Sequence, residues 1–510
     1  MNQLSIYERI KSNIGDDGKL SNDFTLNEEA PPTELAYAPG AMDGIGVYHM
    51  GGSRDLKTET ERIVCLIRKY LKTGDVSLIN DIEVALTEHR ALFLVDPLLQ
   101  SIRENKDSID INKLIEFAVS LVKTSENTEL VKLGISFLGL FDLGKYESIN
   151  NIVAIIALCD EFTLFSVVAA SKWSDGTGLI FWIAQRVNGW GKIHAIERLE
   201  PETEKIRDWI LRNGCSNGVM DAYLGLTCAV KGNLISALRK DHIDDELFDS
   251  ISTVIGAMLD EGPVDGISEY EHAQEALEQY LRHANDHAFS LSHLWIVLSV
   301  QLWAKGAEVD YAGEVLTRCS EIINRPDWRE KIINAVRERN KSDFYCACNA
   351  ASILGIDVNM GILNAIKSEP LEYYPYVQRL FKSADMAIAV ADLYEAVLPL
   401  DDMAKGMGEY YFADNFVKEH SCLDLILPEL ALYPLMGVKL IKTGLNSQVV
   451  RDRNMACRAL SGWVKMLGKP LSDVSPELFV EVKRIFELEV KPDVKARMRK
   501  LIDGEYFEDN

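Results

Sequence analysis

Residues 446–460 read NSQVVRDRNMACRAL, and residues 491–501 read KPDVKARMRKL. Each stretch opens with polar residues and continues with apolar residues at three- and four-residue spacing, which is typical of an amphipathic helix. Val450 and Val494 are each followed by a basic residue and occupy equivalent places 44 residues apart. This spacing predicts two successive helical hairpins with the same internal arrangement.

The first helix of each hairpin is expected in residues 430–441 and 478–488, and residues 374–381 with 383–391 form a third candidate pair. The arrangement resembles the HEAT and armadillo class of α-solenoid, whose repeats are roughly 40–47 residues long. The resemblance is clear over about residues 370–505. It implies hairpins that stack on their neighbours and offer an extended concave surface to a partner.

The chain from Lys57 onward is helical in pattern, with short breaks that carry Gly, Asn, Asp or Pro. Before it, residues 4–14 form a short amphipathic segment, and about 40 residues without helical period follow. We therefore expect an all-α superhelical solenoid of HEAT-like hairpins with an irregular N-terminal arm. The expected divisions are an arm at 1–56, a first repeat region at 57–290 and a second at 291–510.

Composition narrows the class of protein. The 510 residues include 54 Lys and Arg against 78 Asp and Glu, a net charge of −24, which disfavours nucleic acid or a membrane surface as a partner of the whole chain. No secretory leader and no run of about 18 apolar residues is present. Nine cysteines, an odd number without metal-site spacing, fit reduced thiols. We expect a cytoplasmic protein that does not contact a membrane.

Charge is unevenly distributed. Residues 241–280 hold twelve acidic residues and no Lys or Arg, whereas residues 439–500 carry a net charge of +7. The acidic stretch is either a solvated surface or a contact for a basic partner, with Asp244, Asp245 and Glu246 as candidates. The basic stretch is a solvated end, a docking surface, or a site for phosphate or nucleic acid. Its candidate ligands are Arg451, Arg453, Arg458, Lys495, Arg499 and Lys500.

Four of the eight tryptophans lie between residues 173 and 209. In this region His194 and Arg198 are four residues apart on an expected helix, and Glu197 is adjacent. Such a set is usually a structural network, but it is also compatible with a partner contact or an acid/base site. Because Trp and Arg are favoured at interfaces, the candidate contacts here are Trp182, Trp190, His194, Glu197 and Arg198.

The glycine-rich stretch 43–52 has neither the spacing nor the preceding strand of a nucleotide-binding motif. It is expected to pack as a loop, or as an arm that lies in the groove of the solenoid or offers Tyr48 and His49 to a partner. His283 and His287 are four residues apart, but the intervening residues do not complete a zinc motif. No catalytic residue, metal or cofactor is expected.

The sequence therefore favours a non-enzymatic scaffold, adaptor or inhibitor that holds a protein partner on an acidic solenoid. An immunity-type inhibitor, whose acidic surface blocks a basic toxin, is a special case. The alternative is a nucleic-acid- or phosphate-binding protein or enzyme that uses the basic residues 439–500 or the His194, Glu197 and Arg198 set.

Overall fold

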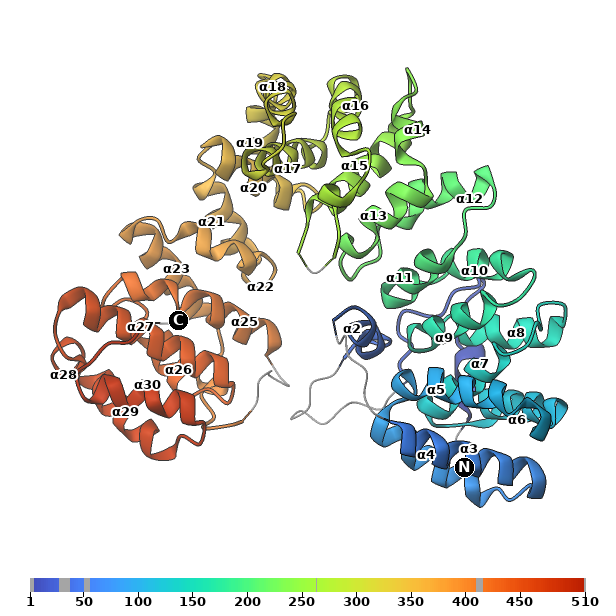
Figure 1. Ribbon diagram of the computed structural model, residues 1–510. Helices are drawn as coiled ribbons and strands as arrows, with labels where there is room; N and C mark the ends of the chain where they lie inside the picture. Colours follow the sequence, from blue (N-terminus) through green and yellow to red (C-terminus); the bar gives the residue numbers. More distant parts are fainter. Residues whose placement is uncertain (1–3, 27–36, 50–55, 263, 410–415, 509–510) are drawn as a thin grey trace. The chain divides into compact units, whose positions relative to one another are not determined.

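The computed structural model describes residues 4–26, 37–49, 56–262, 264–409 and 416–508 (Figure 1). Within these residues the chain is helical, and the one β-bridge pairs Ile14 with Leu20. Contacts divide the chain into two compact units: unit 1 holds the described residues up to 324, and unit 2 holds those from 325 onward. The boundary expected at 290/291 falls inside unit 1, because the helices on its two sides pack on shared neighbours.

Unit 1 consists mainly of α-helices, and from α3 onward most of the loops between them are short. The α-helices are α1 (Ile6–Lys11), α2 (Ala41–His49), α3 (Lys57–Thr73), α4 (Ser77–His89), α5 (Ala91–Glu104), α6 (Ile111–Thr124), α7 (Thr128–Leu138), α8 (Glu147–Ile156), α9 (Asp160–Ala170), α10 (Gly176–Ala184), α11 (Gly189–Arg198), α12 (Glu204–Trp209), α13 (Ala222–Lys231), α14 (Leu234–Leu238), α15 (Asp245–Leu259), α16 (Ala273–His287), α17 (Leu291–Gly306) and α18 (Ala312–Ile323).

Unit 1 has two layers. The odd-numbered helices from α3 to α17 contact one another in succession, and we call them the odd-helix layer. A second layer contains helices α6, α8 and α10, which contact one another in succession, and likewise helices α14, α16 and α18. Helix α7 lies in the middle of the packing, and all of its residues from Glu129 to Leu138 are buried. Asn127 starts α7 by accepting hydrogen bonds from the N–H groups of Glu129 and Leu130, at 2.9 and 3.1 Å.

Unit 2 contains α19 (Trp328–Glu338), α20 (Phe344–Leu354), α21 (Asn359–Ser368), α22 (Pro370–Tyr373), α23 (Ala384–Val397), α24 (Leu400–Met403), α25 (Val417–Ile426), α26 (Val438–Leu445), α27 (Val450–Leu467), α28 (Leu471–Val474), α29 (Pro476–Leu488) and α30 (Pro492–Ile502). Helix α26 packs on α27 and α29 on α30, and the equivalent helices α26 and α29, like α27 and α30, touch each other. Val450 and Val494 are both buried. The all-α solenoid of stacked hairpins is thus confirmed.

Three expectations about the elements of the solenoid need correction. Residues 374–380 form a 3₁₀-helix with a proline in its first turn, not an α-helix. The helix expected at 430–441 begins only at Val438, because Gly437 adopts the left-handed conformation (φ 63°) and breaks it. The arm is not irregular throughout, since α2 is a helix within its glycine-rich part. Residues 27–36 and 50–55 of the arm lie outside the described residues.

Candidate functional site

Helix α2 lies across the odd-helix layer of unit 1 (Figure 1). Its glycines permit the close approach: a Cβ on Gly40, just before the helix, would lie 2.6 Å from the Asp160 carbonyl oxygen of α9, and one on Gly46 would lie 2.6 Å from Leu92 of α5. A Cβ on Gly44 would overlap the indole ring of Trp190 on α11. The sequence signal for this helix was hidden, because glycine is unfavourable inside helices and the stabilising contacts are tertiary.

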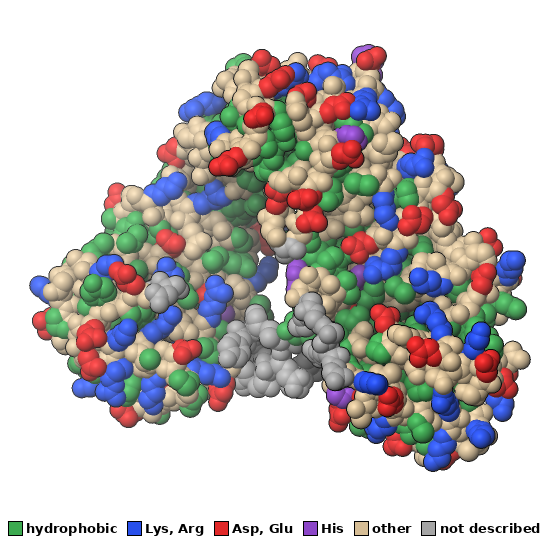
Figure 2. Space-filling model, viewed as in Figure 1, with side chains coloured by type: hydrophobic (Ala, Val, Ile, Leu, Met, Phe, Trp, Pro, Cys, Tyr) green, Lys and Arg blue, Asp and Glu red, His purple; other side chains and the backbone are tan. Residues whose placement is uncertain are grey.

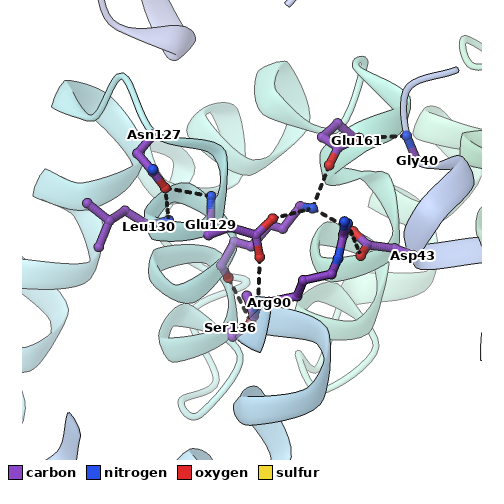
Figure 3. A network of polar contacts seen from close by, with 10 residues as sticks. Gly40, Asp43, Arg90, Asn127, Glu129, Leu130, Ser136 and Glu161 are labelled. Atoms are coloured by element: carbon purple, nitrogen blue, oxygen red, sulfur yellow. Dashed lines mark hydrogen bonds and ion pairs between the residues drawn. The ribbon is translucent and has the colours of Figure 1, made fainter. Parts of the chain in front are cut away.

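A buried ion network lies beneath α2 (Figure 3). The Lys132 ammonium of α7, which is fully buried, lies 2.6 Å from Asp43 of α2, 3.1 Å from Glu129 and 2.5 Å from Glu161. Burial alone lowers the pKa of Lys132, but attraction to the three carboxylates outweighs that effect and raises it. Arg90 adds a second cation 2.9 Å from Asp43.

Backbone groups complete this network. The Gly40 N–H donates to Glu161 at 2.7 Å, and the Ala91 N–H at the start of α5 donates to Glu129 at 2.6 Å. The network therefore ties α2 to three helices of the odd-helix layer through paired groups. Sequence reasoning missed it, although Lys132 and Glu161 each interrupt an apolar run, which was the available signal.

Aromatic rings pack between α2, α11 and α13. The ring centroid of Tyr223 lies 4.9 Å from that of Tyr48 and 5.1 Å from that of Trp190, and His49 Nε2 is hydrogen-bonded to the Tyr223 hydroxyl at 2.7 Å. The His194 ring stacks with Tyr48 at 6.4 Å and is fully buried. The structure thus brings together the candidates from the glycine-rich stretch and from α11.

His194 and Trp190 lie in the interior, with 0% and 6% of their surface exposed. Burial, with repulsion from Arg198, lowers the pKa of His194 to about 3, so the ring is neutral. Neither ring nitrogen has a hydrogen-bond partner among the described residues. Both side chains pack beneath α2 in this conformation, and their contact with a partner stays a prediction.

The other candidates from the tryptophan-rich region are more exposed. Trp182 on α10 is half-buried, and the Arg186 guanidinium lies 4.2 Å from its ring centroid. Arg198 pairs with Glu197 at 3.3 Å and donates to the His194 carbonyl oxygen at 3.3 Å. The Glu197 and Arg198 side chains remain partly accessible, and Arg198 lines the groove described next.

A groove of about 560 Å³ opens beside α2 on the odd-helix layer. Small residues (Ser136, Gly139 and Ala169) lie at the contact of α7 with α9, and two valines are notably exposed, Val47 at 42% and Val168 at 38%. The residues that line the groove are Val47, Leu92, Val95, Asp96, Leu99, Gln100, Arg103, Ser136, Gly139, Leu164, Phe165, Val168, Ala169, Lys172 and Arg198. No sequence motif indicated this groove, because its walls come from five helices.

The charged residues of the groove are mostly cations. Arg103 and Lys172 are exposed, and within the described part of the chain neither side chain has a hydrogen bond or an ion pair. Asp96 is the one carboxylate among the lining residues. The groove therefore combines apolar surface with unpaired positive charge, in a chain whose net charge is −24.

The acidic stretch 241–280 is organised differently. Asp244 caps α15 and forms two hydrogen bonds with Arg212, at 2.9 and 2.8 Å, which lower the pKa of Asp244 well below its usual range. Further pairs join Asp245 to His287 at 2.7 Å, Asp249 to His293 at 2.6 Å and Glu275 to Arg239 at 2.6 Å. Glu246 is exposed and lies 3.9 Å from Arg212. Many carboxylates here are thus paired within the chain.

The candidate cations of the basic stretch 439–500 differ in their surroundings. Arg453 is fully buried and binds Glu489 through two hydrogen bonds, at 2.7 and 3.0 Å, so it is not available to a ligand. Arg451 pairs with Asp424 at 2.6 Å, and Lys495 and Arg499 lie over the Phe486 ring at 5.0 and 4.2 Å. On the face drawn in Figure 2, cationic and anionic side chains are interspersed.

The described residues contain no group of three or more His, Cys, Asp or Glu placed to hold a metal ion. His283 bonds the Leu238 carbonyl oxygen at 3.0 Å, and His287 turns to Asp245. No helix among the described residues is long and apolar enough to span a membrane.

No family model and no curated protein matches this chain. Among solved structures, it aligns with a "Circular tandem repeat protein with novel repeat topology and enhanced subunit contact surfaces" at 16% identity, over 87% of this chain and 94% of the other. The TM-score is 0.14, so the two backbones do not superpose and the alignment carries no argument.

Proposed function

We propose that this protein is a non-enzymatic scaffold, adaptor or inhibitor that holds a partner protein on the odd-helix layer of unit 1. The observation that carries the proposal is the groove beside α2, with its exposed valines and unpaired cations. Apolar surface exposed in a concave site is a common feature of protein-binding surfaces. The proposal includes a HEAT-type origin for the repeats, supported by the 44-residue spacing, and a cytoplasmic location, supported by nine free cysteines.

The packing of α2 supports a binding role for this layer. A nine-residue helix is held there by an acidic side chain, close glycine contacts and aromatic rings contributed by several repeats. A surface built from successive repeats that holds one short helix of its own chain has the chemistry to hold another. Because His194 and Arg453 are buried, neither of these two side chains supports the nucleic-acid or enzymatic alternative in this conformation.

The test is quantitative affinity purification of the tagged full-length chain from its native cell. In the variant Val168→Trp, a neutral indole fills part of the groove from a position that is 38% exposed. The matched control is Val480→Trp in unit 2, where the valine is 66% exposed. We expect wild type and control to recover the same protein near stoichiometry and Val168→Trp to lose it. Recovery of no protein by the wild type, or equal recovery by all three chains, would contradict the proposal.

A further inference from the structure

The groove's chemistry narrows what it binds. Arg103 of α5 and Lys172, just after α9, are exposed cations without a partner among the described residues. A ligand that brings carboxylates to both positions would form ion pairs with these cations without breaking any ion pair of the described residues.

The groove's dimensions fit a short helix. Its α5 wall extends from Leu92 to Arg103. Eleven helical rises of about 1.5 Å make this wall about 16 Å long, the length of a three-turn helix. Ser136, Gly139 and Ala169 carry little side-chain volume, so a helix can approach the contact of α7 with α9 closely.

Helix α2 is an example of such binding on the same layer. It places the Asp43 carboxylate between Lys132 and Arg90, at 2.6 and 2.9 Å, and Val47 on its flank forms part of the groove wall. The geometry points to a specific ligand: the groove binds a short, acidic, amphipathic helix of a partner protein alongside α2. The apolar face of the ligand helix covers Val168 and Leu99, and the carboxylates of the ligand helix pair with Arg103 and Lys172. This inference rests on the proposed function.

The experiment selects peptides from a random 15-residue display library on the immobilised full-length protein. Peptides that also bind the Val168→Trp variant are then removed. Enriched peptides are then synthesised with a fluorescent label, and their affinity is measured by anisotropy. We expect an excess of Asp and Glu, apolar residues at three- and four-residue spacing, and affinity that falls with added salt.

Charge reversal provides the decisive comparison. We expect the double variant Arg103→Glu, Lys172→Glu to weaken peptide binding by at least about tenfold. The control, Lys123→Glu with Lys205→Glu, reverses two exposed cations on α6 and α12 that do not line the groove, and it should leave affinity within about twofold. Peptides without an acidic excess, or equal binding to both double variants, would overturn the inference.

A fatty acid is the competing occupant, because an apolar channel bordered by cations also suits a carboxylate with an acyl chain. Native mass spectrometry that finds a stoichiometric fatty acid in wild type but not in Val168→Trp would overturn the inference. Failure of this inference can be distinguished from failure of the proposed function. If Val168→Trp loses the cellular partner but the charge-reversal variant keeps it, only the inference of an acidic helix is contradicted. If Val168→Trp keeps the cellular partner, the proposed function is contradicted as well.

Discussion

Carboxylates crowd residues 241–280, whereas the groove beside α2 is bordered by cations, and the two regions use their charges in different ways. Asp244, Asp245 and Asp249 are paired with an arginine and two histidines of the same unit. Arg103 and Lys172 of the groove have no such partners among the described residues, and exposed apolar side chains line the same groove.

This difference separates charges that support the fold from charges available to a ligand. Exposed ion pairs contribute little stability, typically up to about 1 kcal/mol, but their charges are already neutralised locally. Unpaired charges beside apolar surface cost the fold almost nothing and are available to an incoming group. A high density of charge in the sequence is therefore a weaker indicator of a binding site than charge without a partner in the structure.

The largest effect on stability is expected at the buried ion network of Lys132, which holds α2 beside the groove. Replacing Lys132 by Ala leaves Asp43, Glu129 and Glu161 without their buried cation, and we expect a loss of about 3–5 kcal/mol in the free energy of unfolding. Urea denaturation measures it. Lys123→Ala on the exposed side of α6 is the control, and an equally small effect of both changes would show that the network does not hold α2.

Asp160 sharpens the contrast between paired and unpaired carboxylates. Burial raises its pKa to about 7, although the N–H groups of Gly191 and Trp190 lower it. Because the folded-state pKa exceeds the unfolded value of about 3.9, the stability contributed by protonation is complete below pH 4 and is lost as pH rises to 7.

We therefore expect the stability of wild type, measured relative to Asp160→Asn, to fall by on the order of 1 kcal/mol per pH unit between pH 4 and 7 and to be constant above that range. Urea denaturation across pH 4–9 measures the difference. Asp244→Asn is the control: because the pKa of Asp244 is lowered, the stability that it contributes is lost only as pH falls below about 4, so its relative stability should stay nearly constant from pH 5 to 9. A pH-independent difference for Asp160→Asn would contradict the raised pKa of Asp160.

The packing of α2 gives an intermediate effect. Gly44→Ala places a methyl group inside the Trp190 ring position, and we expect a loss of about 1–3 kcal/mol with faster proteolysis of α2. The control is Gly178→Ala on α10, where the added Cβ meets no atom within 4 Å. Since Ala is the better helix former, that control should gain about 0.5–1 kcal/mol. Equal outcomes would mean that α2 is not held against Trp190.

The smallest effect compares a paired cation with an unpaired one. Arg212→Ala removes the bonds to Asp208 and Asp244 and should cost up to about 1 kcal/mol, because the pairs are largely exposed. Arg103→Ala should change stability by less than about 0.5 kcal/mol. Thermal denaturation at low and moderate salt distinguishes the two, since only the Arg212 difference should shrink with salt. A larger cost for Arg103→Ala would indicate that it supports the fold.

Sequence periodicity predicted the stacked hairpins because each repeat carries an apolar stripe that becomes buried. Val450 and Val494 belong to such stripes, and both are buried. It did not predict α2, whose stability comes from Trp190, Lys132 and Leu92, residues distant in sequence. The sequence did not predict the groove either, because the residues that line it are also distant from one another in sequence. Proximity of Tyr48 to His194 likewise required the fold, although each was recognised separately as a candidate.

The central claim is that a partner protein lies in the groove beside α2. Its most direct test places a photo-cross-linking amino acid at position 168 of the full-length chain in the native cell, with position 480 as the control. We expect one discrete cross-linked protein from position 168, and its loss when Arg103 and Lys172 are both changed to Glu. No cross-linked protein from position 168, or the same product from both positions, would contradict the claim.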